Sequence, residues 1–312
     1  MRWRSNVVVY SIKVKYSPVY ELINSFYAYI YYPNLKGITL DDQWLKKIRE
    51  RLPQDYAETL LDERWEVLHR TVLLVSQCPN AETVEGFLGW LEQLPAGELY
   101  ERLSPWVQTI PLNLAEVRDQ AVWLLQRWHE YYFQFFDQSC LRDLQEEAHT
   151  LMSRLEVEKP VDLIDQVTGG IYIEPVQELQ EVILVPQYHC APSTILDFYR
   201  AIAVCLYPLR PNSQGKEARQ NVLQIAQCLG DERRLTILQY LSREPRTLIQ
   251  IHQHLKLAKS TVHHHMTSLR RAGLVRAHYI NSTNVAYYSL RDSFIAQLDH
   301  SLKFLLFRME DE

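Results

Sequence analysis

Glycine and cysteine are scarce in this sequence of 312 residues, and long apolar runs are missing. There are only 9 glycines, whereas Leu, Glu, Gln and Arg are plentiful, so we expect helix to dominate. No stretch approaches 18 uncharged apolar residues, which excludes a transmembrane span. The N-terminal apolar run contains Lys13 and Lys15 and offers no small-residue cleavage site, so we do not expect a signal peptide.

The few cysteines are odd in number, widely spaced and never arranged as C-x-x-C. They are Cys78, Cys140, Cys190, Cys205 and Cys228. This usage is typical of reduced and mostly buried thiols, so we expect a cytoplasmic protein. A thiol switch through Cys190 or Cys228 is an alternative, although neither has a sequence-adjacent partner.

Common enzyme motifs are missing as well. The sequence has no Gly-rich phosphate loop, no G-x-S-x-G and no H-E-x-x-H. The segment "QYHCAP" places His189 beside Cys190, but neighbours in a strand point to opposite faces and cannot form a nucleophile–base pair. We therefore expect no enzymatic activity, no cofactor and no metal site.

The length and local patterns indicate two domains, residues 1–212 and 213–312. The first should be a helical α+β domain, because residues 41–167 are helical in pattern while shorter segments are β-rich. We expect the strands of a small sheet at 171–175, 181–188 and 201–209, joined by an N-terminal strand at 6–15. The stretch "PLRPNSQGK" (208–216) has the composition of a linker.

Charge is distributed unevenly between these domains. The net charge is −5, yet residues 216–291 hold 12 Lys and Arg against 4 Asp and Glu. A basic block on an acidic protein indicates a module that binds a polyanion.

The basic block reads as helix, helix, turn, helix and a two-stranded wing. The segments are "EARQNVLQIAQCLG", "ERRLTILQYL", "LIQIHQHL", "STVHHHMTSLRRAG" and the hairpin "LVRAHYI"–"VAYYSL" around "NSTN". This order is that of a winged helix-turn-helix, whose second turn helix enters the major groove. The fold class is therefore mainly α with small β elements.

The segments "LGDERRLTILQYL", "STVHHHMTSLRRAGLV" and "AYYSL" resemble successive signatures of the ArsR-type winged-helix regulators, over about a quarter of the chain. The family often has serine where this sequence has His263. "SPVYELINSFYAY" and "VILVPQY" more loosely resemble an uncharacterised helical domain that precedes this winged helix in some members. The resemblance implies a DNA-binding regulator.

Three consecutive histidines, His263, His264 and His265, lie on the predicted recognition helix. They fan over most of the helix circumference and cannot converge on one metal ion. We expect His263 on the exposed face and His264 beside it, and we expect His265 to pack inward or to form a local hydrogen bond. The predicted DNA-binding residues are Lys259, Ser260, Thr261, His263, His264, Thr267, Arg270, Arg276, Asn281, Ser282, Thr283 and Asn284.

Many ArsR-type proteins sense metals, and the resemblance makes metal sensing an alternative. The helix before the recognition helix has no cysteine pair, and its His252 and His254 do not share a helix face. The last helix offers Asp292, Asp299 and His300 but no second histidine at metal-binding spacing.

The N-terminal domain carries an unusual density of aromatic residues within "LAEVRDQAVWLLQRWHEYYFQFF". Pockets for small molecules are mostly apolar with a few polar groups, which Tyr and Trp provide. The predicted ligand-binding residues are Trp123, Trp128, Tyr131, Tyr132, Phe135 and Tyr188. Equally, these aromatics could fill the core and the dimer interface, and the domain could serve only assembly.

Together these patterns predict a cytoplasmic, one-component transcriptional regulator that acts as a repressor. A homodimer would bind an inverted repeat in double-stranded DNA. A small apolar effector held by the N-terminal domain would release it.

Overall fold

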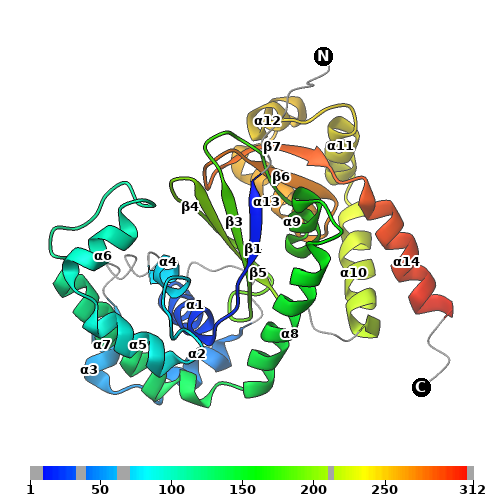
Figure 1. Ribbon diagram of the computed structural model, residues 1–312. Coiled ribbons are helices and arrows are strands. Elements are labelled where there is room, and N and C mark those ends of the chain that lie inside the picture. Colours follow the sequence, from blue (N-terminus) through cyan, green and yellow to red (C-terminus); the bar gives the residue numbers. More distant parts are fainter. Residues whose placement is uncertain (1–9, 33–39, 62–70, 210–213, 308–312) are drawn as a thin grey trace. The chain divides into compact units, whose positions relative to one another are not determined.

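The computed structural model describes residues 10–32, 40–61, 71–209 and 214–307 (Figure 1). They form two compact units. The N-terminal unit consists of residues 10–157 and 178–209, and the C-terminal unit of residues 158–177 and 214–307. The structure is mostly helical with small sheets, which confirms the predicted fold class.

The N-terminal unit is built mainly from helices. Helix α1 begins at Pro18, because Ser17 accepts a hydrogen bond from the Val19 amide and proline suits the first helical position. The helices are α1 (Pro18–Ile30), α2 (Asp42–Arg49), α3 (Gln54–Thr59), α4 (Thr71–Val75), α5 (Val84–Gln93), α6 (Ala96–Leu103), α7 (Leu114–Tyr131), η2 (Phe133–Phe135) and α8 (Gln138–Arg154).

The sheet of this unit has the order β1-β3-β5-β4, with β1 (Ser11–Val14), β3 (Glu181–Gln187), β5 (Ile202–Pro208) and β4 (Ile195–Phe198). The first three strands are parallel, and β4 is antiparallel to β5. Val185 and Val204 lie in the hydrophobic core that includes Phe26, Phe87 and Trp128 of the helices. Helix α8 contacts β1 and β3 and runs along the other side of the sheet from α1 (Figure 1).

The C-terminal unit contains α9 (Pro160–Thr168), β2 (Ile171–Ile173), α10 (Gln214–Leu229), α11 (Glu232–Leu241), α12 (Leu248–Leu255), α13 (Lys259–Arg271), β6 (Val275–Tyr279), β7 (Val285–Leu290) and α14 (Ser293–Phe307). Its sheet has the order β2-β6-β7, in which β6 and β7 form an antiparallel hairpin and β2 pairs in parallel with β6. Helices α10 to α13 pack with this sheet around a second core that includes Ile237, Ile251 and Leu269.

The strand at 171–175 is the main difference from the predicted fold. We expected it beside the strands at 181–188 and 201–209, but β2 pairs with β6 of the wing instead. The expected boundary near residue 212 lies outside the described residues, and it places 158–177 in the first domain. The structure groups this segment with the winged helix, because its strand completes the wing sheet.

Gly170 makes this pairing sterically feasible. Its φ is +116°, and a Cβ atom there would lie 2.6 Å from the carbonyl oxygen of Val275. Any other residue would force β2 away from β6. The preceding Gly169 ends α9 in the left-handed conformation, as glycines after a helix often do.

Candidate nucleic-acid interface

The helix–turn–helix is formed by α12, a three-residue turn and α13. Helix α12 begins with a capping box, in which Thr247 and Gln250 bond each other's backbone amides. It ends at Lys256 with φ 54°, and α13 begins at Lys259. These local signals lie close together in the sequence, which is why the motif could be predicted from it.

Helix α13 has one buried and one exposed face. Val262, Met266 and Leu269 are almost completely buried in the second core, as their spacing predicts. Of the predicted DNA-binding residues on this helix, Lys259, Ser260, His263 and His264 are exposed, whereas Thr261, Thr267 and Arg270 are partly exposed. The exposed set is polar and basic, which suits both phosphates and base edges.

His265 differs from its two neighbours because it is buried. Neither of its ring nitrogens has a hydrogen-bond partner among the described residues. Burial lowers the pKa of His265, although the nearby Asp231 carboxylate opposes this shift. The imidazole therefore belongs to the packing between α13 and the start of α11, not to the exposed face.

The wing turns at four small polar residues. Asn281 has φ 43°, and the Ser282 hydroxyl accepts a hydrogen bond from the Asn284 amide at 3.1 Å. Asn281, Thr283 and Asn284 are exposed, and Ser282 is partly exposed. Asparagine tolerates a left-handed conformation better than most residues, so the tip sequence fits this turn.

Arg276 at the base of the wing is held by a carboxylate that the sequence analysis did not single out. Asp165 of α9 accepts from Arg276 Nε at 3.0 Å and from Arg291 Nε at 2.9 Å. Asp165 and Arg291 are both buried, and Arg276 is partly exposed. A DNA phosphate bound by Arg276 would therefore share the guanidinium with Asp165. The predicted contact of Arg276 with DNA stays a prediction.

A second carboxylate on the same segment contacts both wing strands. Glu174 accepts a hydrogen bond from Tyr287 and pairs with His278 Nδ1 at 2.7 Å, while His278 Nε2 lies 2.7 Å from the Ser289 hydroxyl. Burial alone would raise the pKa of Glu174, but the hydrogen bonds from His278 and Tyr287 outweigh it and lower the pKa. Asp165 and Glu174 therefore fix α9 and β2 to the wing.

The predicted ligand-binding aromatics do not share one environment. Trp128 is fully buried, and its indole donates a hydrogen bond to the Ser25 hydroxyl at 2.9 Å. Phe135 is 65% exposed beneath the Arg51 guanidinium, and Trp123 packs against Tyr56. Tyr131 contacts the same Tyr56 ring. Trp128 therefore belongs to the core, where its ring packs against Tyr132 with 4.9 Å between the ring centroids, and ligand binding by the six aromatics stays a prediction.

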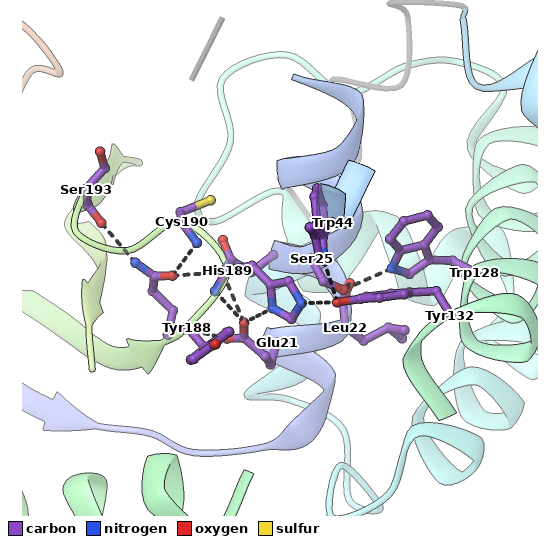
Figure 2. A network of polar contacts seen from close by, with 12 residues as sticks. Glu21, Leu22, Ser25, Trp44, Trp128, Tyr132, Tyr188, His189, Cys190 and Ser193 are labelled. Carbon is purple, nitrogen blue, oxygen red and sulfur yellow. Dashed lines mark hydrogen bonds and ion pairs between the residues drawn. The ribbon is translucent and has the colours of Figure 1, made fainter. Parts of the chain in front are cut away.

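Tyr132 and Tyr188 instead adjoin a buried polar network (Figure 2). His189 lies between Glu21 and Tyr132, with Nδ1 bonded to the Glu21 carboxylate and Nε2 2.5 Å from the Tyr132 hydroxyl. The Trp44 indole donates to the Tyr132 oxygen at 3.0 Å, which leaves that hydroxyl to donate to His189. The Glu21 carboxylate also accepts the backbone amides of Tyr188 and His189.

This network ties α1 to the turn that follows β3 and to the end of α7. The sequence predicts a strand at His189, but β3 ends at Gln187 and His189 lies in the turn beyond it. Burial raises the pKa of the adjacent Cys190 thiol, so it remains protonated at neutral pH. Glu21 gave no sequence signal, because 168 residues separate it from His189.

The histidines of α12, which the family resemblance makes candidate metal ligands, have other contacts in the structure. His252 Nδ1 bonds the Leu257 carbonyl, and the His254 ring stacks on Tyr240. Within the described part of the chain, no group of three His, Cys, Asp or Glu side chains could hold a metal ion. All five cysteines are free thiols. Among the described helices, none is sufficiently long and apolar to cross a membrane.

Comparison with known proteins assigns the helix–turn–helix but not the N-terminal unit. Residues 231–277, from the cap of α11 into β6, match the family described as bacterial regulatory protein, arsR family. No curated protein and no solved structure matches the chain. The C-terminal unit therefore contains an ArsR-family helix–turn–helix, the DNA-binding domain of a transcriptional regulator.

Proposed function

We propose that the protein represses transcription by binding an inverted-repeat operator as a homodimer. The exposed polar face of α13 carries this proposal, because Lys259, Ser260 and His263 project from the helix that the matched domain uses for recognition. The basic block supplies the charge for phosphate contacts, and the wing tip adds polar side chains. A repressor of this kind works on chromosomal DNA, in the cytoplasm.

The dimer is supported by apolar side chains left exposed on two helices that pack together, α10 and α14. They are Leu223 on α10 and Ile295, Leu302, Leu306 and Phe307 on α14. On α14 the spacings of seven and four residues place Ile295, Leu302 and Leu306 on one face. A second copy would bury this stripe, because large apolar patches are rarely left open to water.

Binding to duplex DNA tests the proposal directly. Titration of the full chain onto random and genomic fragments, followed by footprinting of those bound, should show two protected half-sites. Their centres should lie about one helical turn, roughly 34–36 Å, or a multiple apart. With about six to ten phosphates neutralised, affinity should fall on the order of 10³–10⁵-fold between 50 and 200 mM salt.

A single unpaired half-site, or affinity independent of salt, would contradict the proposal. Repression itself is tested in cells with a reporter placed behind the footprinted sequence. Deletion of the gene should raise reporter expression, and a fall would make the protein an activator.

We also propose that a ligand of the N-terminal unit releases the protein from DNA. The basis is the size of that unit and the aromatic surface left exposed at Trp123, Phe135 and Tyr188. The burial of Trp128 weakens the expectation of a large apolar pocket along α7. A ligand changes DNA affinity only if it binds the DNA-competent and incompetent states differently. Release of operator from the full chain by a compound that binds this unit would establish it.

A further inference from the structure

A cleft in the N-terminal unit opens beside β1, the edge strand of its sheet. It measures about 440 Å³, within the usual size range of small-molecule sites. One wall is formed by β1 and the start of β3, and the other by Gln77 after α4 and by Trp106. None of the six aromatics predicted to bind a ligand lines it.

Lys13 and Lys15 share the face of β1 that lines this cleft, because side chains alternate along a strand. Lys13 is paired with Ile183 across the sheet, and Ile183 belongs to the core, so this face continues from the core to the sheet edge. At that edge the Lys13 side chain is 56% exposed and lies at the mouth of the cleft.

Among the described residues, Lys13 has a carboxylate partner and Lys15 has none. Lys13 forms an ion pair with Glu181, with 2.5 Å between Nζ and Oε2. Lys15 is only partly exposed, and no described carboxylate lies within ion-pair distance of it. The described residues that line the cleft therefore include two cations and one anion, an excess of one positive charge.

The other residues that line the cleft would suit the organic part of a ligand whose anionic group pairs with a lysine. Trp106 and Leu73 provide apolar surface, while Ser76 and Gln77 provide a hydroxyl and an amide. A single excess charge matches one carboxylate better than a doubly charged phosphate.

We propose that this cleft binds a small organic monocarboxylate, whose carboxylate pairs with Lys15 and whose carbon skeleton packs on Trp106. This site goes beyond the proposed function and does not depend on DNA binding. The competing explanation is that lysines on an edge strand only prevent pairing with another sheet. Binding measurements distinguish the two.

The test titrates the full-length protein, without DNA, with benzoate, phenylacetate and hexanoate at constant ionic strength. The matching neutral amides serve as ligand controls, and affinity is measured by calorimetry. Lys15→Met retains the length of the side chain and removes the charge. It should weaken carboxylate binding by about tenfold or more, because a charge-assisted hydrogen bond is lost.

Two further variants make the test specific. Lys46→Met removes an equal charge from an exposed ion pair on α2 and should leave binding unchanged. Glu181→Gln should tighten binding, because it releases Lys13 and removes the one anion of the cleft. An edge-protecting role predicts no such gain.

The proposal is overturned if none of the three carboxylates binds saturably, or if Lys15→Met binds them as tightly as the wild-type protein. Equal binding of the amides would also overturn it, because the charge would then play no part. Circular dichroism of each variant excludes unfolding as the cause of lost binding.

Discussion

His263 and His265 lie two positions apart on α13 and have opposite environments. The first is exposed beside Lys259 and Ser260, and the second is buried against α11. Because a helix turns about 100° per residue, two positions are enough to cross from the solvent face to the core. The histidine run is therefore not one site, and each residue has its own consequence.

For His263 we expect a loss of specificity. His263→Ala should reduce discrimination between operator and random DNA by about 1–3 kcal/mol, the value of a good base contact. Parallel titrations of both DNAs measure this difference, with His149→Ala, exposed on α8 of the N-terminal unit, as the control. An equal loss on both DNAs would place His263 at a phosphate instead.

For His265 we expect an effect of pH on stability. Its pKa is lowered in the folded state by burial, whereas in the unfolded chain it takes up a proton near pH 6.5. The unfolded state then binds more protons, so the free energy of unfolding should fall as pH drops below about 6.5. Urea unfolding at about pH 7 and about pH 5 should show a smaller decrease for His265→Leu than for the wild type.

The exposed His263→Ala variant is the control for that measurement and should retain the wild-type pH dependence. If His265→Leu lost as much stability on acidification as the wild type, titration of other groups would account for the whole effect.

At the scale of elements, α9 and β2 belong to the DNA-binding unit. Asp165 joins them to two arginines, and one of these, Arg291, is buried with it. Removing one partner of a buried ion pair leaves the other charge without compensation. Loss of Asp165 should therefore destabilise the wing.

We expect Asp165→Asn to destabilise the C-terminal unit by about 3–5 kcal/mol in urea unfolding. Asp299→Asn is a matched control, because its exposed pair with Lys303 should contribute less than about 1 kcal/mol. Adding Arg291→Met to Asp165→Asn should recover part of the loss, since the unpaired charge is removed with it. If Asp165→Asn cost no more than Asp299→Asn, Asp165 would not hold α9 to the wing.

The same elements show what the sequence can and cannot predict. The apolar spacing of α13, the cap of α12 and the polar wing tip are local signals, so that motif was predicted residue by residue. "IYIEP" also predicts a strand, but the pattern of one strand does not specify the strand with which it pairs. Strand β2 pairs with β6, which lies more than a hundred residues later in the sequence. The pairs Asp165–Arg276 and Glu21–His189 were missed for the same reason.

At the scale of the whole molecule, the chain leaves the N-terminal unit after residue 157 and returns to it at residue 178. The intervening segment is bonded to the wing through Asp165, Glu174 and β2. Both ends of this segment are therefore joined through the chain to the N-terminal unit. For the same reason, a fragment of residues 213–312 lacks a strand of its own sheet, and a test of the isolated DNA-binding unit has to include 158–177.

The dimer is the remaining property of the whole molecule, and the stripe on α14 makes it testable. Leu306→Asp places a charge on the exposed apolar face, where Leu306 is 68% exposed, so the fold of one copy should tolerate it. We expect light scattering to show a monomer, because a carboxylate buried without a partner opposes association. Affinity for the two-half-site operator should fall while affinity for one half-site is unchanged. His300→Asp, also exposed on α14 but off this stripe, should remain dimeric. If Leu306→Asp stayed dimeric and His300→Asp did not, the interface would lie on the other face of the helix.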